Sequence, residues 1–347
     1  MQTKILVTGG TGYIASWIIK YLLEDGYTVH TTVRDISNEE KYNHLRDIEG
    51  KNKGELKIFE ADLLDEGSFK KAMVGVESVI HTASPFFISG IKDAQKQLIA
   101  PAKMGTKNVL ETANEIETVK KIVVTSSAAA IYGDNADVYK APDNTFTEKI
   151  WNTSSNLKHQ PYSYSKTVAE KQAWEIAEKQ HRWILTTINP GFVIGPSLTK
   201  RIDSTSIDFV KSIVDGRFKM GVPDLYIGVV DVRDVARAHI NAALLEKATS
   251  RHILIAETLN ALDLAGFVKE KYGDRYPVPK KHLPKFLLYI FGPFMGFTWK
   301  YIKLNIGIPM KFDNSFSKEN LDIDYRDPKD SILDHINQLM QDGLVKK

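Results

Sequence analysis

A glycine-rich turn stands near the start of the chain, directly after a short β-branched run and before an apolar stretch with helical spacing. Residues 8–15 read TGGTGYIA. In this context Gly9 permits a tight turn, and Gly12 lets a pyrophosphate approach the backbone at the positive end of the helix dipole. Ala15 replaces a third glycine where the helix packs on the strand. The motif predicts a dinucleotide-binding site, and the alternative is a turn with a purely structural role.

Short β-branched runs alternate with amphipathic stretches through the first two-thirds of the sequence. This alternation is typical of βαβ units, whose parallel strands carry helices on both faces of the sheet. The expected fold is therefore α/β, a doubly wound parallel sheet of the Rossmann type. The first helix should end at Asp25-Gly26. The expected strands are Lys4 to Thr8, Thr28 to Val33, Leu56 to Glu60, Ser78 to Thr82, Lys121 to Ser126, Trp183 to Asn189 and His252 to Ala256.

The sequence changes character after about Ala256, where prolines stand among clustered aromatic residues. This composition predicts a smaller C-terminal cap of short helices and loops that binds the substrate. We expect a nucleotide-binding domain at residues 1–190, to which residues 225–256 return. The substrate-binding cap is expected at residues 191–224 and 257–347.

The longest late apolar run covers residues 286–299, between Lys285 and Lys300. Its 14 residues are too few for a membrane span, which needs about 20. We therefore expect no membrane span. The run is interpreted as a buried or pocket-lining helix broken near Gly292-Pro293, and contact with a membrane surface is the alternative.

The chain has 347 residues, and its 46 basic and 43 acidic side chains are spread along it. It lacks the basic stripe of a nucleic-acid-binding protein, so nucleic acid is not an expected partner. The absence of cysteine excludes disulfides and thiolate metal sites, and no HxxxH or HExxH spacing occurs, so no metal site is expected. No leader is recognised at the N-terminus, and we expect a cytoplasmic protein.

The residue at the end of the second expected strand indicates whether the protein binds NAD or NADP. An acidic side chain there pairs with the ribose hydroxyls of NAD, whereas this chain has Val33 and Arg34. A guanidinium binds the 2′-phosphate of NADP as a fork, and Lys41 could assist it. The sequence therefore predicts NADPH as the cofactor. Asp35 weakens this argument, and the alternative is that Arg34 is a solvated loop charge. Asp62, after the third strand, is placed to meet the adenine amino group or to cap a helix.

Ser127 follows the fifth expected strand, and Tyr162 and Lys166 lie further on, at the start of an expected helix. Their i, i+4 spacing puts the tyrosine and the lysine on one helical face. With the glycine motif and the serine in this order, the sequence resembles the extended short-chain dehydrogenase/reductase superfamily. It resembles in particular the dihydroflavonol reductase-like branch, which includes cinnamoyl-CoA reductases and microbial aldehyde and ketone reductases. The likeness runs from about residue 3 to residue 335 and rests on residues 31–35, 61–63, 81–85, 125–128, 189–190 and 195–196.

This resemblance implies the reduction of a carbonyl group. Tyr162 would donate a proton to the carbonyl oxygen, Ser127 would orient that oxygen, and Lys166 would hold the nicotinamide ribose. Together with the oxidised nicotinamide, Lys166 is expected to lower the pKa of the phenol from near 10 to about 7. The expected cofactor contacts are Thr8, Gly9, Thr11, Gly12, Tyr13, Ile14, Arg34, Lys41, Asp62, Leu63, Thr82, Ala83, Ser84, Tyr162, Lys166, Pro190 and Val193.

Three more residues near these motifs have separate interpretations. Tyr164 is assigned to packing, because Val168 stands where its lysine partner would be needed. His81 is assigned to the core of a buried strand, with no catalytic role. Asn108 resembles the helix asparagine that steadies a water near the lysine in some relatives.

The substrate pocket is expected to be aromatic, which favours apolar aldehydes and ketones over sugar nucleotides. Tyr132 stands where plant dihydroflavonol reductases carry an asparagine, and residues 159–166 differ from the cinnamoyl-CoA reductase signature, so neither plant substrate is assigned. We expect an NADPH-dependent reductase of a small-molecule carbonyl substrate, monomeric or homodimeric. The alternatives are a sugar-nucleotide epimerase or dehydratase that retains NAD, and a non-enzymatic NADP-sensing protein. The expected substrate contacts are Ser127, Phe86, Phe87, Tyr132, Phe192 and Val193, with part of the cap.

Overall fold

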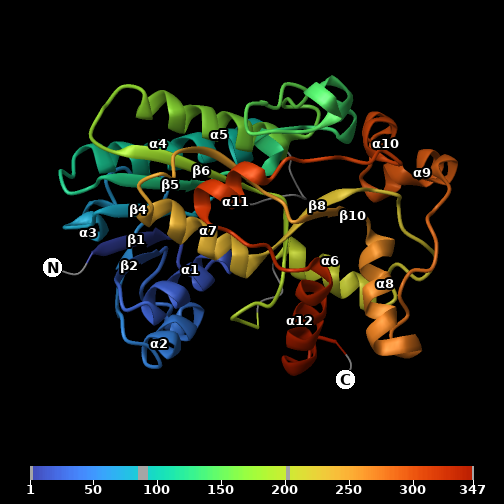
Figure 1. Cartoon of the computed structure of the whole chain (residues 1–347), viewed down its shortest axis with the longest axis horizontal. Helices are drawn as coiled ribbons and strands as arrows, with labels where there is room; N and C mark the ends of the chain where they lie inside the picture. The colour runs from blue at the N-terminus through green and yellow to red at the C-terminus, as the bar shows by residue number, and fades with distance from the viewer. Residues whose placement is uncertain (1–2, 85–92, 201–203, 346–347) are drawn as a thin grey trace.

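The computed structural model describes residues 3–84, 93–200 and 204–345. Its main sheet contains β1 (Lys4–Thr8), β2 (Thr28–Val33), β3 (Glu55–Glu60), β4 (Ser78–His81), β5 (Lys121–Thr125), β6 (Ile184–Pro190) and β9 (Ser250–Leu254). The strands are all parallel and follow the order β3-β2-β1-β4-β5-β6-β9 (Figure 1). Every expected strand forms, with bounds within two residues of the expected ones. The predicted doubly wound parallel sheet is therefore confirmed.

Two pairs of helices cover the two faces of this sheet: α1 (Tyr13–Glu24) with α7 (Val232–Leu244), and α4 (Ala100–Asn114) with α5 (Pro161–Ala177) (Figure 1). Successive side chains of a strand point to opposite faces, so each buried strand contributes to two cores. In β1, Ile5 and Val7 pack with α1 and α7, whereas Leu6 packs with α4 and α5. Two short helices, α2 (Asn43–Glu49) and α3 (Lys70–Met73), complete these layers.

A second sheet contains β7 (Phe192–Ile194), β8 (Ile227–Asp231) and β10 (Glu257–Leu259). In it, β8 is parallel to β7 and antiparallel to β10. None of these strands was among the expected ones. In β7 and β10, three residues each are too few for a period of two to show in the sequence. The chain passes from β6 into β7 through Gly191, whose backbone lies against Gly228 of β8.

The remaining helices are α6 (Thr205–Val214), α8 (Ala261–Tyr272), α9 (Lys285–Phe291), α10 (Trp299–Asn305), α11 (Ser315–Leu321) and α12 (Pro328–Gln341). Of these, α6, α8 and α12 share an apolar core with β7 and β8, and α11 contacts β9. Figure 1 shows α9 and α10 at the end of the molecule opposite to β1 and β2. The division of the chain into a nucleotide-binding domain and a cap stays a prediction.

The late apolar run breaks where it was expected to break, but it is not buried. A 3₁₀ turn, η7 (Gly292–Met295), directly follows α9. The exposed fraction is 63% for Phe286, 89% for Phe294 and 67% for Trp299, so the interpretation as a buried or pocket-lining helix is wrong. The small core around Leu288 accommodates only one face of α9, which leaves the other apolar side chains outside. Among the residues that the structure describes, each helix is too short or too polar to span a bilayer.

Replacing Gly191 by alanine should destabilise the protein, because the added Cβ would lie 2.2 Å from the carbonyl oxygen of Gly228. Backbone cannot move aside cheaply, so we expect a loss of about 1–3 kcal/mol in the free energy of unfolding, measured in urea. Gly266→Ala in α8 is the matched control, since its Cβ would meet no described atom within 4 Å. Alanine should stabilise that helix by about 0.5–1 kcal/mol. Equal effects of the two substitutions would contradict the close approach.

Candidate active site

The glycine-rich turn lies at the carboxyl end of β1, beside the carboxyl end of β4. The strand order reverses between these two strands, and this switch point is where open α/β sheets bind ligands. Gly9 has a left-handed φ of +68°, and a Cβ there would lie 3.0 Å from the Cβ of Ala83. Gly12 is the N-cap of α1, and its amide donates to the Gly9 carbonyl at 2.9 Å. This geometry is that of a phosphate-binding turn at a helix N-terminus.

Hydrogen bonds hold the end of β4 against this turn. The Oγ1 of Thr8 lies 2.8 Å from Nδ1 of His81 and accepts from the amide of Ala83 at 3.1 Å. The hydroxyl of Thr82 donates to the Thr8 carbonyl at 2.5 Å. Burial, and secondarily the charge of Lys166, lower the pKa of His81 to about 3, so the imidazole is neutral. His81 is thus a satisfied core residue on a buried strand.

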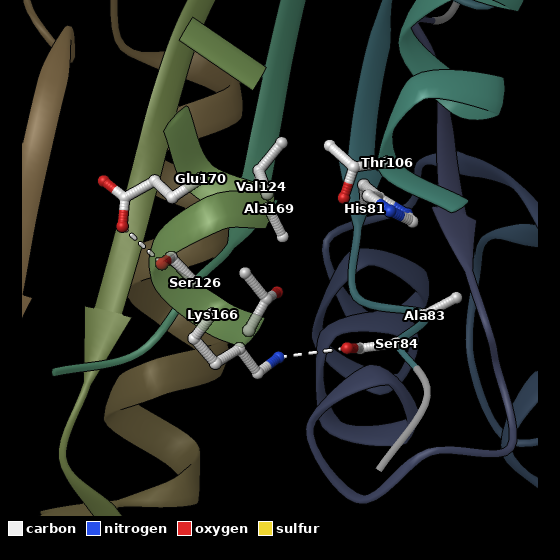
Figure 2. A pocket seen from close by; sticks show the side chains of 10 residues that line it. His81, Ala83, Ser84, Thr106, Val124, Ser126, Lys166, Ala169 and Glu170 are labelled. Atoms are coloured by element: carbon white, nitrogen blue, oxygen red, sulfur yellow. Dashed lines mark hydrogen bonds between the residues drawn. The ribbon is translucent and has the colours of Figure 1, made fainter. Parts of the chain in front are cut away.

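Three side chains with expected catalytic roles lie together at the carboxyl edge of the sheet. Ser127 follows β5, and its hydroxyl is hydrogen-bonded to that of Tyr162 at the start of α5. One turn further along α5, the ammonium of Lys166 donates to Oγ of Ser84 at 3.0 Å and lies 5.9 Å from the centre of the Tyr162 ring (Figure 2). The fold therefore brings the serine, the tyrosine and the lysine together with Ser84, beside the glycine-rich turn.

The pKa values of this cluster differ from the expectation. Burial raises the pKa of Tyr162 to about 12, although the hydrogen bond from Ser127 acts to lower it. Burial also lowers the pKa of Lys166 to about 8. The expected lowering of the phenol pKa is therefore not produced by the side chains of this protein, because burial outweighs an ammonium almost 6 Å from the ring. Near neutral pH Tyr162 holds its proton and Lys166 its charge.

A small cavity lies on the inner side of Lys166 (Figure 2). Its volume is about 20 Å³, enough for one water molecule. Polar groups from several elements line it, including Thr106 of α4, Ser126 after β5 and Glu170 of α5. The cavity can therefore hold a water that bridges the lysine to the polar groups beneath it.

Glu170 is the centre of a buried hydrogen-bond network that the sequence analysis missed. Its carboxylate accepts from Nε of Arg251 at 2.6 Å, from Nδ2 of Asn189 at 2.7 Å and from the hydroxyl of Ser126. Asn189 also donates to the carbonyl of Ser127 at 3.1 Å. The network ties α5, β6 and β9 to the backbone of Ser127.

A sequence signal for this network existed. Glu170 stands four residues after Lys166, so it continues the helical face that carries Tyr162. A carboxylate on a face that points into the sheet needs a buried partner, and Arg251 stands directly before the expected strand His252 to Ala256. The pairing itself required the parallel register of β6 and β9.

Arg34 directly follows β2 and has an exposed side chain, as does Lys41 at the end of the 3₁₀ helix η1 (Glu39–Lys41). The carboxylate of Asp35 accepts both from the amide of Ser37 at 3.0 Å and from its hydroxyl at 2.6 Å. These hydrogen bonds lower the pKa of Asp35 and hold its carboxylate within its own loop. The arginine is thus the residue of this strand end that is available to a phosphate group.

Asn108 does not reach the lysine, so the sequence interpretation of this residue is wrong. Its Nδ2 donates to the carbonyl of Asp65 at 2.8 Å, and its Oδ1 accepts from the amide of Gly67 at 3.0 Å. The side chain holds the loop after β3, because its position on α4 faces that loop. Asp62 in the same loop accepts from the amide of Leu64 at 2.8 Å, within a turn rather than at a helix start.

The other expected cofactor residues surround the turn and the ends of the strands. The hydroxyl of Tyr13 donates to the carbonyl of Gly195 at 2.5 Å, which joins the start of α1 to the segment after β7. Leu63 lies against the position of Gly105 on α4. The remaining expected cofactor residues are Thr11 in the turn, Ile14 in α1, Pro190 at the end of β6 and Val193 in β7.

Among the described residues, no three His, Asp or Glu side chains gather as metal ligands.

A second cavity of about 130 Å³ lies beside the start of α5. Tyr132 lines it and stacks on Phe146 with ring centres 5.0 Å apart. Its role as a substrate contact stays a prediction. Phe192 instead packs edge-on against Phe209 at 5.1 Å and is not among the lining residues. Phe86 and Phe87 lie outside the described residues. The lining residues that the sequence analysis did not name are Ala129, Gly133, Asn135, Gln160, Ser163, Leu225, Tyr226, Ile227, Tyr301 and Asn305.

Buried polar contacts fasten α10 to the loop before α5. The amide of Asn305 donates to Asp134 at 2.7 Å, and the other oxygen of that carboxylate lies 2.7 Å from Nε2 of His159. Gln160 adopts a left-handed φ of 55° and donates to the carbonyl of Gly133 at 3.0 Å. One wall of the second cavity is therefore held to the residues that precede Tyr162.

The chain belongs to the NAD dependent epimerase/dehydratase family, whose profile matches residues 5–256. This places it in the extended short-chain dehydrogenase/reductase superfamily and confirms the resemblance found in the sequence. A cinnamoyl-CoA reductase of Medicago truncatula is 38% identical over 273 residues, which cover 77% of this chain and 80% of the relative. An anthocyanidin reductase of Vitis vinifera is 35% identical over 324 residues, covering 89% and 93%.

Solved structures agree with this assignment. The yeast methylglyoxal/isovaleraldehyde reductase Gre2, solved with NADPH, superposes with a TM-score of 0.80 at 27% identity, covering 99% of this chain and all of that one. The NADPH complex of Gre2 from Candida albicans gives a TM-score of 0.78 at 30% identity, covering 98% and 99%.

Glu170→Ala should destabilise the protein by about 3–5 kcal/mol, because it leaves Arg251 buried without its ionic partner. The measurement is the free energy of unfolding in urea. Glu175→Ala, on the exposed side of the same helix, is the control and should change this free energy by less than about 0.5 kcal/mol. A loss no larger than that of the control would show that the ion pair does not hold the helix.

Proposed function

We propose that this protein is an NADPH-dependent reductase that converts an apolar aldehyde or ketone to the alcohol. The observation that carries this proposal is the cluster of Ser127, Tyr162 and Lys166 at the carboxyl edge of the sheet, next to a phosphate-binding turn. A hydride donor bound at that turn would bring its nicotinamide to this cluster. The names of the relatives, which include reductases of several carbonyl compounds, support the same reaction class.

The residues at the switch point fit a dinucleotide. The start of α1, with Gly9 and Gly12 before it, suits the pyrophosphate, and the ammonium of Lys166 suits the hydroxyls of the nicotinamide ribose. Bound NADPH supplies the hydride. Thr82, Ala83 and Ser84 line the path between these two ends, at the end of β4.

The proton for the alcohol comes from the protein. As hydride reaches the carbonyl carbon, negative charge develops on the oxygen, and Ser127 donates a hydrogen bond that orients and stabilises it. Tyr162 then transfers its phenolic proton to that oxygen. A phenol with a raised pKa is still a stronger acid than the alcohol that forms, so this transfer is favourable. Lys166 stabilises the resulting phenolate until Tyr162 regains a proton from solvent.

The preference for an apolar substrate rests on the second cavity. Tyr132 and Tyr301 present aromatic rings there, and the described residues that line the cavity include no lysine or arginine to bind the diphosphate of a sugar nucleotide. Its polar side chains, from Asn135, Gln160, Ser163 and Asn305, could hydrogen-bond a carbonyl or hydroxyl function of the substrate.

Tyr162→Phe should lower the turnover of an aldehyde panel by about 10²–10⁴-fold, because it removes the proton donor but keeps the ring. The rate is followed by the loss of NADPH absorbance, and the affinity for NADPH, from fluorescence titration, should stay nearly unchanged. Tyr164→Phe is the matched control on the same helix and should keep its turnover. Unchanged turnover of Tyr162→Phe would refute the proposed role.

Arg34→Asp should shift the coenzyme preference from NADPH toward NADH, because it replaces the proposed partner of the 2′-phosphate by a group that repels it. The ratio of kcat/KM for the two coenzymes should fall by at least about tenfold toward NADH. Arg275→Asp, far along the chain and exposed, should leave the ratio unchanged. An unshifted ratio in Arg34→Asp would place the phosphate contact elsewhere.

The family also contains epimerases and dehydratases, which keep the nucleotide bound through a catalytic cycle. Purified protein that retains NAD and turns over without added coenzyme would favour that alternative. A nucleotide-sensing protein has no need of a proton donor or of a buried lysine beside it, so the cluster argues against this class. If the protein oxidises NADPH with no carbonyl compound of a broad panel, that result would favour the nucleotide-sensing class instead.

A further inference from the structure

Large apolar side chains are exposed together at one end of the molecule. They occupy α9, η7 and the start of α10, which pack against each other, and the indole of Trp299 donates to the carbonyl of Tyr289 at 3.0 Å. A groove of about 430 Å³ runs beside Phe297 and Trp299. We name this surface the apolar cap face, and its members are Phe286, Ile290, Phe291, Phe294 and Trp299.

The apolar cap face lies within a basic segment. Residues 275–312 contain six lysines and one arginine and no acidic residue, whereas the rest of the chain has 39 basic and 43 acidic side chains. Lys285 begins α9, and Lys300 and Lys303 are exposed on α10. The one segment of the chain with a strong positive charge is thus the one that exposes aromatic rings.

Aromatic and aliphatic side chains flanked by lysines are the pattern of an element that lies in the interface of an anionic bilayer. The rings enter the boundary between headgroups and acyl chains while the ammonium groups remain among the anionic headgroups. A second copy of the chain fits this surface less well. A symmetric contact would bring the same face of both copies together and set lysine against lysine.

We propose that the apolar cap face docks this protein reversibly on anionic lipid membranes. Figure 1 shows α9 and α10 at the end of the molecule away from the β1 label and the N-terminus. The helix that begins with Trp299 also carries Tyr301 and Asn305 into the wall of the second cavity. Docking therefore brings that cavity close to the bilayer surface. The proposal is independent of the reductase function.

The test is flotation of the full chain with unilamellar vesicles. Vesicles of phosphatidylcholine mixed with phosphatidylserine should carry the protein upward, and vesicles of phosphatidylcholine alone should carry at least about tenfold less. Raising the salt concentration should reduce the bound fraction, since it screens the lysines. Equal binding to both kinds of vesicle, or no binding to either, would overturn the proposal.

Two variants identify the surface. Phe294→Ser combined with Trp299→Ser should reduce binding by at least about tenfold, because two rings no longer enter the interface. Lys300→Glu combined with Lys303→Glu should do the same through charge. The unfolding temperature of both variants should stay near that of the parent, since all four side chains are exposed.

The matched controls are Val74→Ser, at an apolar side chain that is 64% exposed on another part of the molecule, and Lys158→Glu combined with Lys179→Glu. Neither should change vesicle binding. Equal losses in the controls would overturn the assignment to this face. A dimer in solution that Phe294→Ser with Trp299→Ser converts to a monomer, without vesicle binding by the parent, would overturn it in favour of contact between two copies.

Discussion

The ion pair between Glu170 and Arg251 lies beneath the candidate active site and connects the helix that carries Tyr162 and Lys166 to the strands behind it. Both charges are almost fully buried, a state that is tolerated only when each finds partners at close range. Here the carboxylate is shared among the arginine, Asn189 and Ser126, and the guanidinium also donates to the carbonyls of residues 148 and 150. The pair thereby joins a helix, two strands and a loop into one unit.

The main sheet could be predicted from the sequence because each strand is a separate β-branched run between turn signals. The strands of the second sheet could not, because β7 and β10 are only three residues long and show no period, and the approach of Gly191 to Gly228 exists only in the folded chain. The run at 286–299 was misjudged for a related reason. Hydrophobicity tells how strongly a segment favours burial, whereas the available core around Leu288 and Ile302 decides how much of it is buried.

The candidate site divides in the same way. The neighbourhood of Tyr162 and Lys166 follows from helical spacing alone, and Ser127 joins them because parallel strands end at one edge of a sheet. The role of Asn108 was misassigned because the resemblance matches only the residue type at that position. Its actual contacts depend on the loop after β3, which α4 faces in this fold. Burial raises the pKa of Tyr162 in the protein alone, and the order of residues does not reveal that burial. The expected lowering of this pKa includes the charge of a bound nicotinamide and stays a prediction.

The double attachment of Asn305 has a consequence for how substrate selectivity can diversify in such a fold. Its Nδ2 donates to the carboxylate of Asp134, and its Oδ1 accepts from the backbone amide of Asn135. These two hydrogen bonds anchor α10 at that point. A cavity with one anchored wall changes its shape through the side chains of its other walls, at Tyr132, Leu225 and Tyr226, rather than by moving a helix. Substitutions at these positions would change the shape of the second cavity and leave the side chains at the strand ends in place.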